Sequence, residues 1–262
     1  MKRSLICLLA AVAVLGAFVS GSCAQPRELF NGKNLDNWYT FVKERGVNTD
    51  PNQVFTVQDG MIRISGAELG CITTNESFKN YRLILEYKWG QGKPVGGSDL
   101  TWARDSGVLL HSQGEDGAWH GTWMCSIEAN IIEGGMGDFI VVGDGSDKFQ
   151  ITANIRPEKQ GSCGVWDLKG CPSTINSGRI NWYGRDPEWT NTVDFKGKND
   201  LDKPIGEWNR MEILCKDAMI YVFFNGKLVN FAYNVRPSEG KIQIQSENAE
   251  IFFRKITIET LE

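Results

Sequence analysis

The chain has 262 residues, of which 41% are hydrophobic and 23% are charged, and its formal net charge at pH 7 is −4. It contains no basic cluster outside its first residues, which excludes nucleic acid as an expected partner. This length suits one large β-sandwich preceded by a short export segment.

Residues 1–24 have the features of an export signal. Lys2 and Arg3 precede an apolar run that ends at Val19, and small residues then lead to Cys23. The run is shorter than the roughly 20 apolar residues that a membrane span needs. Two outcomes are open: cleavage before Cys23 leaves a lipid anchor on that cysteine, and cleavage after Ala24 releases a soluble protein. We expect a cell-envelope protein, either periplasmic or an outer-membrane lipoprotein, with a single domain over residues 25–262.

Short alternating runs separated by turn dipeptides predict antiparallel sheets along the rest of the chain. The first is VFTVQDGMIRIS, where Asp59-Gly60 marks a hairpin, and IYVFFNGKLVNF repeats the signal at Asn225-Gly226. The run NYRLILEYKW places five large residues on one face, namely Tyr81, Leu83, Leu85, Tyr87 and Trp89. Two more strands end the chain, with a turn near Asn248 between them. Helix signals are nearly absent, so the pattern predicts an all-β sandwich or jelly roll.

The segment 161–203 differs because it is rich in Gly, Pro, Asn, Asp and Trp. We expect an extended loop there, which is either functional or a partly ordered flap, with only GRINWYG resembling a strand. Cys163 and Cys171 lie in this segment on neighbouring turns, and they are the natural disulfide pair of an oxidising envelope. Zinc is disfavoured for them, because the segment has no C-x-x-C pair and no nearby histidine. Three other cysteines lie in strand-like runs and are expected to be buried thiols, namely Cys71, Cys125 and Cys215.

Two strand-like stretches carry the main candidate site residues. His111 ends the run GVLLH and has a side chain suited to proton transfer near neutral pH. Glu128 lies in SIEANII, where Ser126, Glu128 and Asn130 share the face opposite the apolar residues. A polar face of this kind on a jelly-roll strand predicts a ligand site. The alternatives are a histidine that only caps a strand end and a glutamate on a solvated face.

Further candidates surround these two stretches. Arg104 and Asp105 precede the glycine of RDSG, and either could bind a sugar hydroxyl, although a plain surface ion pair explains them as well. Glu247 lies at the tip between the last two strands, where a simple hairpin turn is the alternative. His120 and Trp123 lie among loop tryptophans whose faces suit sugar rings, although core packing explains any one of them.

Metal binding is a weaker expectation. Asp144 and Asp147 in GDGSDKF lack the ligand number of a calcium loop. A divalent ion held by Glu128, His111 and a third group could stabilise an enolate directly. Glu133 and Asp138 flank glycines in EGGMGD and are a second candidate pair for a cation.

The ordered phrases of the mature chain resemble the 3-keto-disaccharide hydrolase family of bacterial envelope proteins. The matching phrases include LFNGKNLDNW, DSGVLLH, SIEANIIEGGMGDF, EWNRMEI and IQIQSENAEIFFRKITI, and they span nearly the whole of residues 25–262. The resemblance implies a concanavalin A-like jelly roll of two curved antiparallel sheets, with carbohydrate on the concave face. The segment 161–203 has no counterpart that we can align, so an aglycone preference cannot be carried over.

The resemblance also implies cleavage of glycosides whose C3 hydroxyl a separate dehydrogenase has oxidised to a ketone. A C3 carbonyl acidifies the C2 proton, so a base can remove it and the C1 aglycone can leave by β-elimination. On this hypothesis Glu128, His111 and Glu247 are catalytic, and Arg104, Asp105, Trp123, Asn130 and His120 bind substrate. No cofactor is certain beyond the divalent ion considered above.

Two other functions stay open on the same residues. One is a non-catalytic carbohydrate-binding protein, in which these side chains only bind sugar hydroxyls. The other is a conventional glycosidase with Glu128 as one of two carboxylates. Fold alone does not separate these readings.

Overall fold

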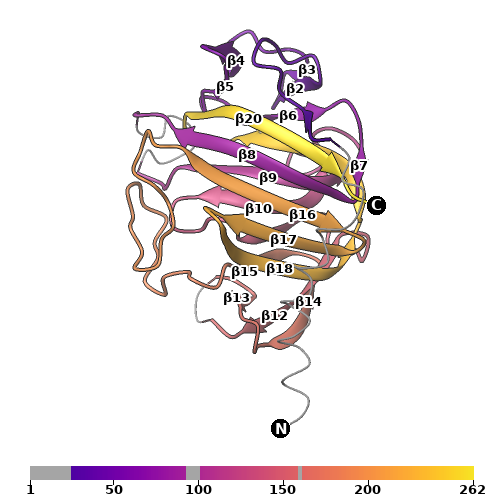
Figure 1. The fold of residues 1–262 in the computed structure, drawn as a ribbon, viewed down its shortest axis with the longest axis vertical. Coiled ribbons are helices and arrows are strands. Elements are labelled where there is room, and N and C mark those ends of the chain that lie inside the picture. Colours follow the sequence, from indigo (N-terminus) through magenta and orange to yellow (C-terminus); the bar gives the residue numbers. More distant parts are fainter. Residues whose placement is uncertain (1–24, 93–100, 159–160) are drawn as a thin grey trace.

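The computed structural model describes residues 25–92, 101–158 and 161–262, which form strands and turns and contain no helix. No helix long and apolar enough to cross a membrane occurs among them. The strands form two facing sheets that share one hydrophobic core (Figure 1). The predicted all-β jelly-roll sandwich is therefore confirmed.

The first sheet carries the polar residues singled out in the sequence. In spatial order it consists of β3 (Gly46–Val47), β2 (Trp38–Val42), β6 (Gly70–Thr74), β19 (Glu239–Ser246), β9 (Asp105–Gln113), β10 (Cys125–Ile132), β11 (Phe139–Val142) and β15 (Gly178–Asn181). The short strand β7 (Phe78–Lys79) pairs with the start of β19.

The second sheet covers the other side of the core. It consists of β4 (Phe55–Gln58), β5 (Met61–Ile64), β20 (Ile251–Thr260), β8 (Tyr81–Trp89), β16 (Asn209–Lys216), β17 (Met219–Phe224), β18 (Lys227–Arg236), β12 (Gln150–Arg156) and β14 (Cys171–Ile175). The strand β1 (Arg27–Glu28) pairs with β20, and β13 (Gly164–Trp166) joins the sheets by pairing with β12 and, in parallel, with β15.

The local predictions hold where a period of two was clear. All five large residues of β8 are buried, and the residues between them are partly exposed. Asp59-Gly60 and Asn225-Gly226 both have positive φ angles and join β4 to β5 and β17 to β18, as a two-residue hairpin requires. The last two strands also form, but β19 and β20 lie in different sheets, so the turn near Asn248 crosses between the layers.

The segment 161–203 is more ordered than predicted. It contributes β13, β14 and β15, and the stretch without strands begins only after Asn181. The strand expected in GRINWYG is confirmed as β15. The strands β13 and β14 were not predicted, because they are short and their residues do not alternate regularly between buried and exposed.

The predicted Cys163–Cys171 disulfide is wrong, because both thiols are free and exposed. The strand β12 lies between β13 and β14, since Ile155 pairs with Trp166 on one side and with Cys171 on the other. Strands flanking a common neighbour are about 10 Å apart, beyond the roughly 7 Å between Cα atoms that a disulfide spans. The chain crosses over β12 at Gly170, where a Cβ atom would lie only 2.4 Å from the Ile155 carbonyl oxygen.

Free thiols at these positions predict a labelling result. We expect a thiol-alkylating reagent added to native protein without reductant to modify Cys163 and Cys171 rapidly. Cys71 and Cys215 should stay unmodified until the protein unfolds, because burial raises the pKa of each to about 12 and shields its sulfur. Peptide mass spectrometry measures the labelling. Recovery of a cross-linked Cys163–Cys171 peptide pair would contradict the strand order described here.

Candidate functional site

A row of directly opposed residues crosses the first sheet on the face that points away from the core. From β15 to β2 it reads Arg179, Ile140, Glu128, Leu109, Gln243, Thr73 and Tyr39. A second row beside it contains Asn130, Gly107, Gln245, Cys71 and Phe41. We call this surface, with Asp105 and Glu247 at its end, the polar face. The predicted grouping of Ser126, Glu128 and Asn130 opposite the apolar residues of β10 is confirmed, since the apolar ones lie in the core.

Glu128 lies at the centre of the polar face and is only 3% exposed. The neighbouring strand leaves space for its carboxyl group at Gly107. A Cβ atom on Gly107 would lie 2.2 Å from Glu128 Oε1 and 2.5 Å from Gln245 Oε1. Glycine is therefore required here for room, because the ends of the Glu128 and Gln245 side chains both occupy the space above it.

Several buried polar atoms on or beside this face have no hydrogen-bond partner in the described part of the chain. They are Asp105 Oδ1, Ser126 Oγ, Asn130 Oδ1 and Gln245 Oε1. Buried polar atoms in native proteins are nearly always paired, so a cluster of unpaired ones indicates a place for water or a ligand. Most of these atoms are acceptors, which suits a ligand with several hydroxyl donors.

Three carboxyl groups share this environment. Burial raises the pKa of Glu128 well above its ordinary value, and the nearby Glu247 raises it further. Burial also raises the pKa of Asp105 strongly, with Glu247 as the second cause. The pKa of Glu247 is raised to about 7 by burial, and Arg179 opposes that rise. Burial thus favours the protonated form in all three carboxyl groups, and the pKa of Glu247, at about 7, lets that group titrate near neutral pH.

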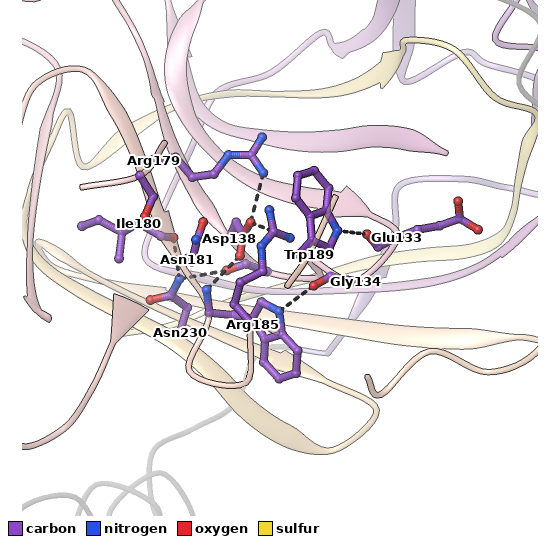
Figure 2. A network of polar contacts seen from close by, with 12 residues as sticks. Glu133, Gly134, Asp138, Arg179, Ile180, Asn181, Arg185, Trp189 and Asn230 are labelled. Carbon is purple, nitrogen blue, oxygen red and sulfur yellow. Dashed lines mark hydrogen bonds and ion pairs between the residues drawn. The ribbon is translucent and has the colours of Figure 1, made fainter. Parts of the chain in front are cut away.

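Arg179 on β15 is the cation beside these carboxyl groups. Its Nη1 donates to Asp138 Oδ2 at 3.0 Å, and Asp138 is fully buried (Figure 2). The other Asp138 oxygen accepts from the backbone nitrogen of Trp182 at 2.8 Å, and Arg185 forms an ion pair with Asp138 at 3.4 Å. Figure 2 shows the two guanidinium groups converging on the one carboxylate.

The loop between β9 and β10 covers the other half of the polar face. Trp123 packs on Cys71 and Leu109, and its Nε1 donates to the Gly70 carbonyl at 3.3 Å. Trp119 stacks on Trp123 with ring centroids 5.7 Å apart. Trp123 is thus nearly buried, and its packing on Cys71 and Leu109 leaves little of its ring surface open to a sugar.

The structure does not bring His111 to Glu128. His111 has a φ of 54° at a bulge between β9 and β19, which reverses the alternation that the sequence suggested. Its Nδ1 donates to the Pro237 carbonyl at 2.8 Å, and its ring packs edge-on against Tyr81 in the core. Burial lowers the pKa of His111 to about 4. The expectation that His111 and Glu128 face one hollow is therefore wrong.

Arg104 also lies outside the carboxyl cluster. It forms a buried ion pair with Glu133 at 2.7 Å and a second one with Asp194 at 2.8 Å. This network ties the start of β9 to the segment after β15, so Arg104 has a structural role in place of the predicted contact with substrate. The prediction for Arg104 missed these ion pairs because a single sequence does not show which carboxylates lie near an arginine in the fold.

The remaining predicted site residues fall into two groups, one on the polar face and one outside it. Three of them lie on the polar face with Glu128, namely Asp105, Asn130 and Glu247. The charge interactions of Glu247 with Asp105 and Glu128, and the unpaired oxygens of Asp105 and Asn130, support this placement. His120 is exposed on the covering loop, edge-on to Trp119 at 4.1 Å between ring centroids. Gly107, Arg179 and Gln245 were not predicted as site residues. The alternation in GRINW and in KIQIQS was the only signal for the last two.

A metal centre does not fit the described residues. No group of three His, Cys, Asp or Glu side chains converges there as metal ligands do. Glu133 and Asp138, a predicted cation pair, are each neutralised by arginine. We therefore derive no step through a metal ion.

A hollow of about 510 Å³ lies at the opposite end of β9, between β7 and the start of β19. Its lining includes Lys79, Gln113 and Glu239 and none of the predicted site residues. Because it has no cluster of unpaired polar atoms, we place the candidate site on the polar face.

The model of the 3-keto-alpha-glucoside-1,2-lyase-like domain matches residues 25–259. Among curated proteins, none matches the chain. Two crystal structures from Parabacteroides distasonis ATCC 8503, both provisionally assigned as glycosyl hydrolases, have a similar fold. One is 18% identical with a TM-score of 0.52, over 90% of this chain and 94% of its own. The other is 21% identical with a TM-score of 0.51, over 90% and 100%.

Proposed function

The chain belongs to the family of the 3-keto-alpha-glucoside-1,2-lyase-like domain, and from that membership we propose that it cleaves 3-keto-glycosides by C2 proton abstraction and β-elimination. One observation supports this most directly: three carboxyl groups with raised pKa values share the polar face with unpaired acceptors. A carbohydrate supplies the hydroxyl donors that those acceptors lack.

Glu247 is the proposed base. Its pKa of about 7 leaves a large fraction of the carboxylate free at neutral pH, and a base is most effective when its pKa is near the working pH. It takes the C2 proton, and the electron pair of the C2–H bond passes into an enolate with the C3 carbonyl.

Glu128 is the proposed acid, because burial raises its pKa well above the ordinary value and so favours its protonated form. The enolate electrons then form a C1=C2 double bond as the C1–O bond breaks, and the aglycone oxygen takes the Glu128 proton. Addition of water across that bond completes a net hydrolysis. Two carboxyl groups with different environments thus take two roles, as acid–base pairs commonly do.

The cellular setting is part of the proposal. The expected export signal, with or without a lipid anchor at Cys23, places the reaction in the cell envelope, and residues 1–24 lie outside the described structure. A separate dehydrogenase supplies the 3-keto sugar.

The test uses a synthetic 3-keto-glucoside in deuterated water, with the unoxidised glucoside as control. We expect cleavage of the ketone alone, with deuterium at C2 of the product, measured by NMR. A carbohydrate-binding protein would cleave neither compound. A conventional two-carboxylate glycosidase would cleave the unoxidised glucoside.

The pH dependence tests the role of Glu247. Activity should rise through about pH 7, because the raised pKa delays formation of the free carboxylate. Glu247→Gln should lower kcat by about 10²–10⁴-fold and abolish this rising limb. Steady-state rates from pH 5 to 9 measure both effects. A rising limb that persists in the variant would assign the base to another group.

A further inference from the structure

Arg179 and Arg185 bind the same carboxylate, yet they differ in exposure. The Arg185 side chain is 4% exposed, whereas the Arg179 side chain is 24% exposed. Arg185 lies over the Trp189 ring with its guanidinium carbon 3.9 Å from the ring centroid. Its Nη1 lies where a Cβ atom on Gly135 would be, which confines it further. Arg185 is therefore fixed inside the loop that follows β15, and Arg179 has the more exposed side chain of the two.

Arg179 is also held in a defined place. Asp138 is fully buried and takes one hydrogen bond from the Trp182 backbone, so its carboxylate cannot turn freely. It binds one nitrogen of Arg179 at 3.0 Å. The register aligns Arg179 with Glu128 across β11, about two strand spacings or 10 Å between Cα atoms. An arginine side chain is long enough to cover most of that span.

The groups around it make Arg179 distinct on the polar face. Asp105, Glu128 and Glu247 are carboxyl groups that interact electrostatically with it. The unpaired amide atoms of Asn130 and Gln245 are acceptors. Among the described residues of this cluster, Arg179 is the fixed positive charge.

We propose that Arg179 is a catalytic residue that neutralises the enolate oxygen of the substrate. This inference rests on the proposed function. When Glu247 removes the C2 proton, negative charge develops on the C3 oxygen, and the guanidinium donates a hydrogen bond to that oxygen without transferring a proton. The charge returns to carbon as the C1–O bond breaks, so Arg179 ends the cycle unchanged. A donor already held by Asp138 needs little reorganisation, which is the condition for strong transition-state stabilisation.

The experiment compares Arg179→Ala, Arg179→Lys and Arg185→Ala with wild type on a 3-keto-glucoside. We expect Arg179→Ala to lower kcat by about 10²–10³-fold, as loss of one oxyanion donor does, with a much smaller change in KM. Added guanidinium chloride, at a concentration below that which unfolds the protein, should restore part of the rate. Arg179→Lys keeps the positive charge, so its kcat should lie between the kcat of Arg179→Ala and that of wild type. The rate of C2 deuterium exchange should fall in parallel with kcat.

Arg185→Ala distinguishes catalysis from structure, because it also removes one guanidinium from Asp138. If Arg179 only balances the Asp138 charge, the two alanine variants should lose the same activity and neither should be rescued. That result would overturn the inference, as would an unchanged kcat in Arg179→Ala. If Arg179→Ala fails to fold, Arg179→Lys carries the test. A folded Arg179→Lys protein with the wild-type kcat and the wild-type rate of C2 deuterium exchange would also overturn the inference. Arg210→Ala, on the second sheet, is the control and should keep full activity. Wild-type protein that neither cleaves the ketone nor exchanges C2 would instead refute the proposed function.

Discussion

Glu128→Gln should abolish most cleavage of a 3-keto-glycoside that has a sugar or alkyl aglycone, lowering kcat by about 10²–10⁴-fold. Glutamine has the same shape and retains the contacts in the buried space above Gly107, but it cannot give a proton to the leaving oxygen. A 4-nitrophenyl aglycone leaves without protonation, so the same variant should keep far more of its activity on that substrate. Initial rates on the two aglycones measure this difference.

The same substitution should alter the pH dependence of stability in a defined direction. Burial raises the pKa of Glu128 in the folded state, so its protonated form stabilises the fold below the unfolded pKa. That contribution to stability is lost as pH rises from the unfolded-state pKa of about 4.5 through the higher folded-state pKa. Glutamine never ionises, so the difference in Tm between Glu128→Gln and wild type should shift in favour of the variant as pH rises over this interval.

Glu212→Gln, which breaks a partly exposed ion pair on the second sheet, is the matched control for the activity measurement and should keep full activity. Equal losses on both aglycones would argue against Glu128 as the acid.

Gly107→Ala should inactivate the protein while leaving it folded. The added methyl group would lie 2.2 Å from Glu128 Oε1, so the Glu128 carboxyl group must move away. The atoms in conflict are the ends of side chains and not backbone, and we expect a loss of only about 1–3 kcal/mol in the free energy of unfolding. Displacing a reacting group by about 1 Å costs on the order of 10²-fold in rate, so the activity loss should be at least that large. Urea denaturation and initial rates measure the two effects separately.

Gly92→Ala provides the control for this substitution, since no atom lies within 4 Å of its added Cβ. We expect wild-type activity from it. If Gly107→Ala kept full activity at normal stability, the site would not depend on the Glu128 position and the carboxyl cluster would lose its proposed role.

The carboxyl cluster illustrates why the fold suits this chemistry. The three carboxyl groups come from different parts of the first sheet: Asp105 begins β9, Glu128 lies in β10 and Glu247 follows β19. Burial raises all three pKa values, Glu247 raises those of Asp105 and Glu128 further, and Arg179 opposes the rise in each. One sheet thus holds carboxyl groups in different electrostatic surroundings, as the proposed acid and base require.

Prediction from the sequence succeeded where a local rule acts alone. The five large residues of β8 alternate inward because a strand has a period of two, and Asn225-Gly226 forms a hairpin turn because both residues tolerate positive φ. The polar face of β10 was visible for the same reason. Each of these features depends on residues within about ten positions of one another.

Prediction failed where distant segments decide the outcome. His111 looked like a neighbour of Glu128, but the bulge at its position turns it toward Pro237 and Tyr81. Arg104 looked exposed until its partners Glu133 and Asp194 were placed. Cys163 and Cys171 are close in sequence, yet β12 separates their strands.

The sequence by itself therefore determined that this chain is an all-β sandwich, which strands alternate, and that Glu128 and Asn130 share a polar face. Only the tertiary structure decided that Arg179, Gly107 and Gln245 join them and that His111 does not. The physical reason is that alternation is a property of one strand, whereas strand order, register and bulges arise from packing two sheets on a common core. The proton affinities of the carboxyl groups follow from that packing, because burial and the position of Arg179 do not exist until the sheets have assembled.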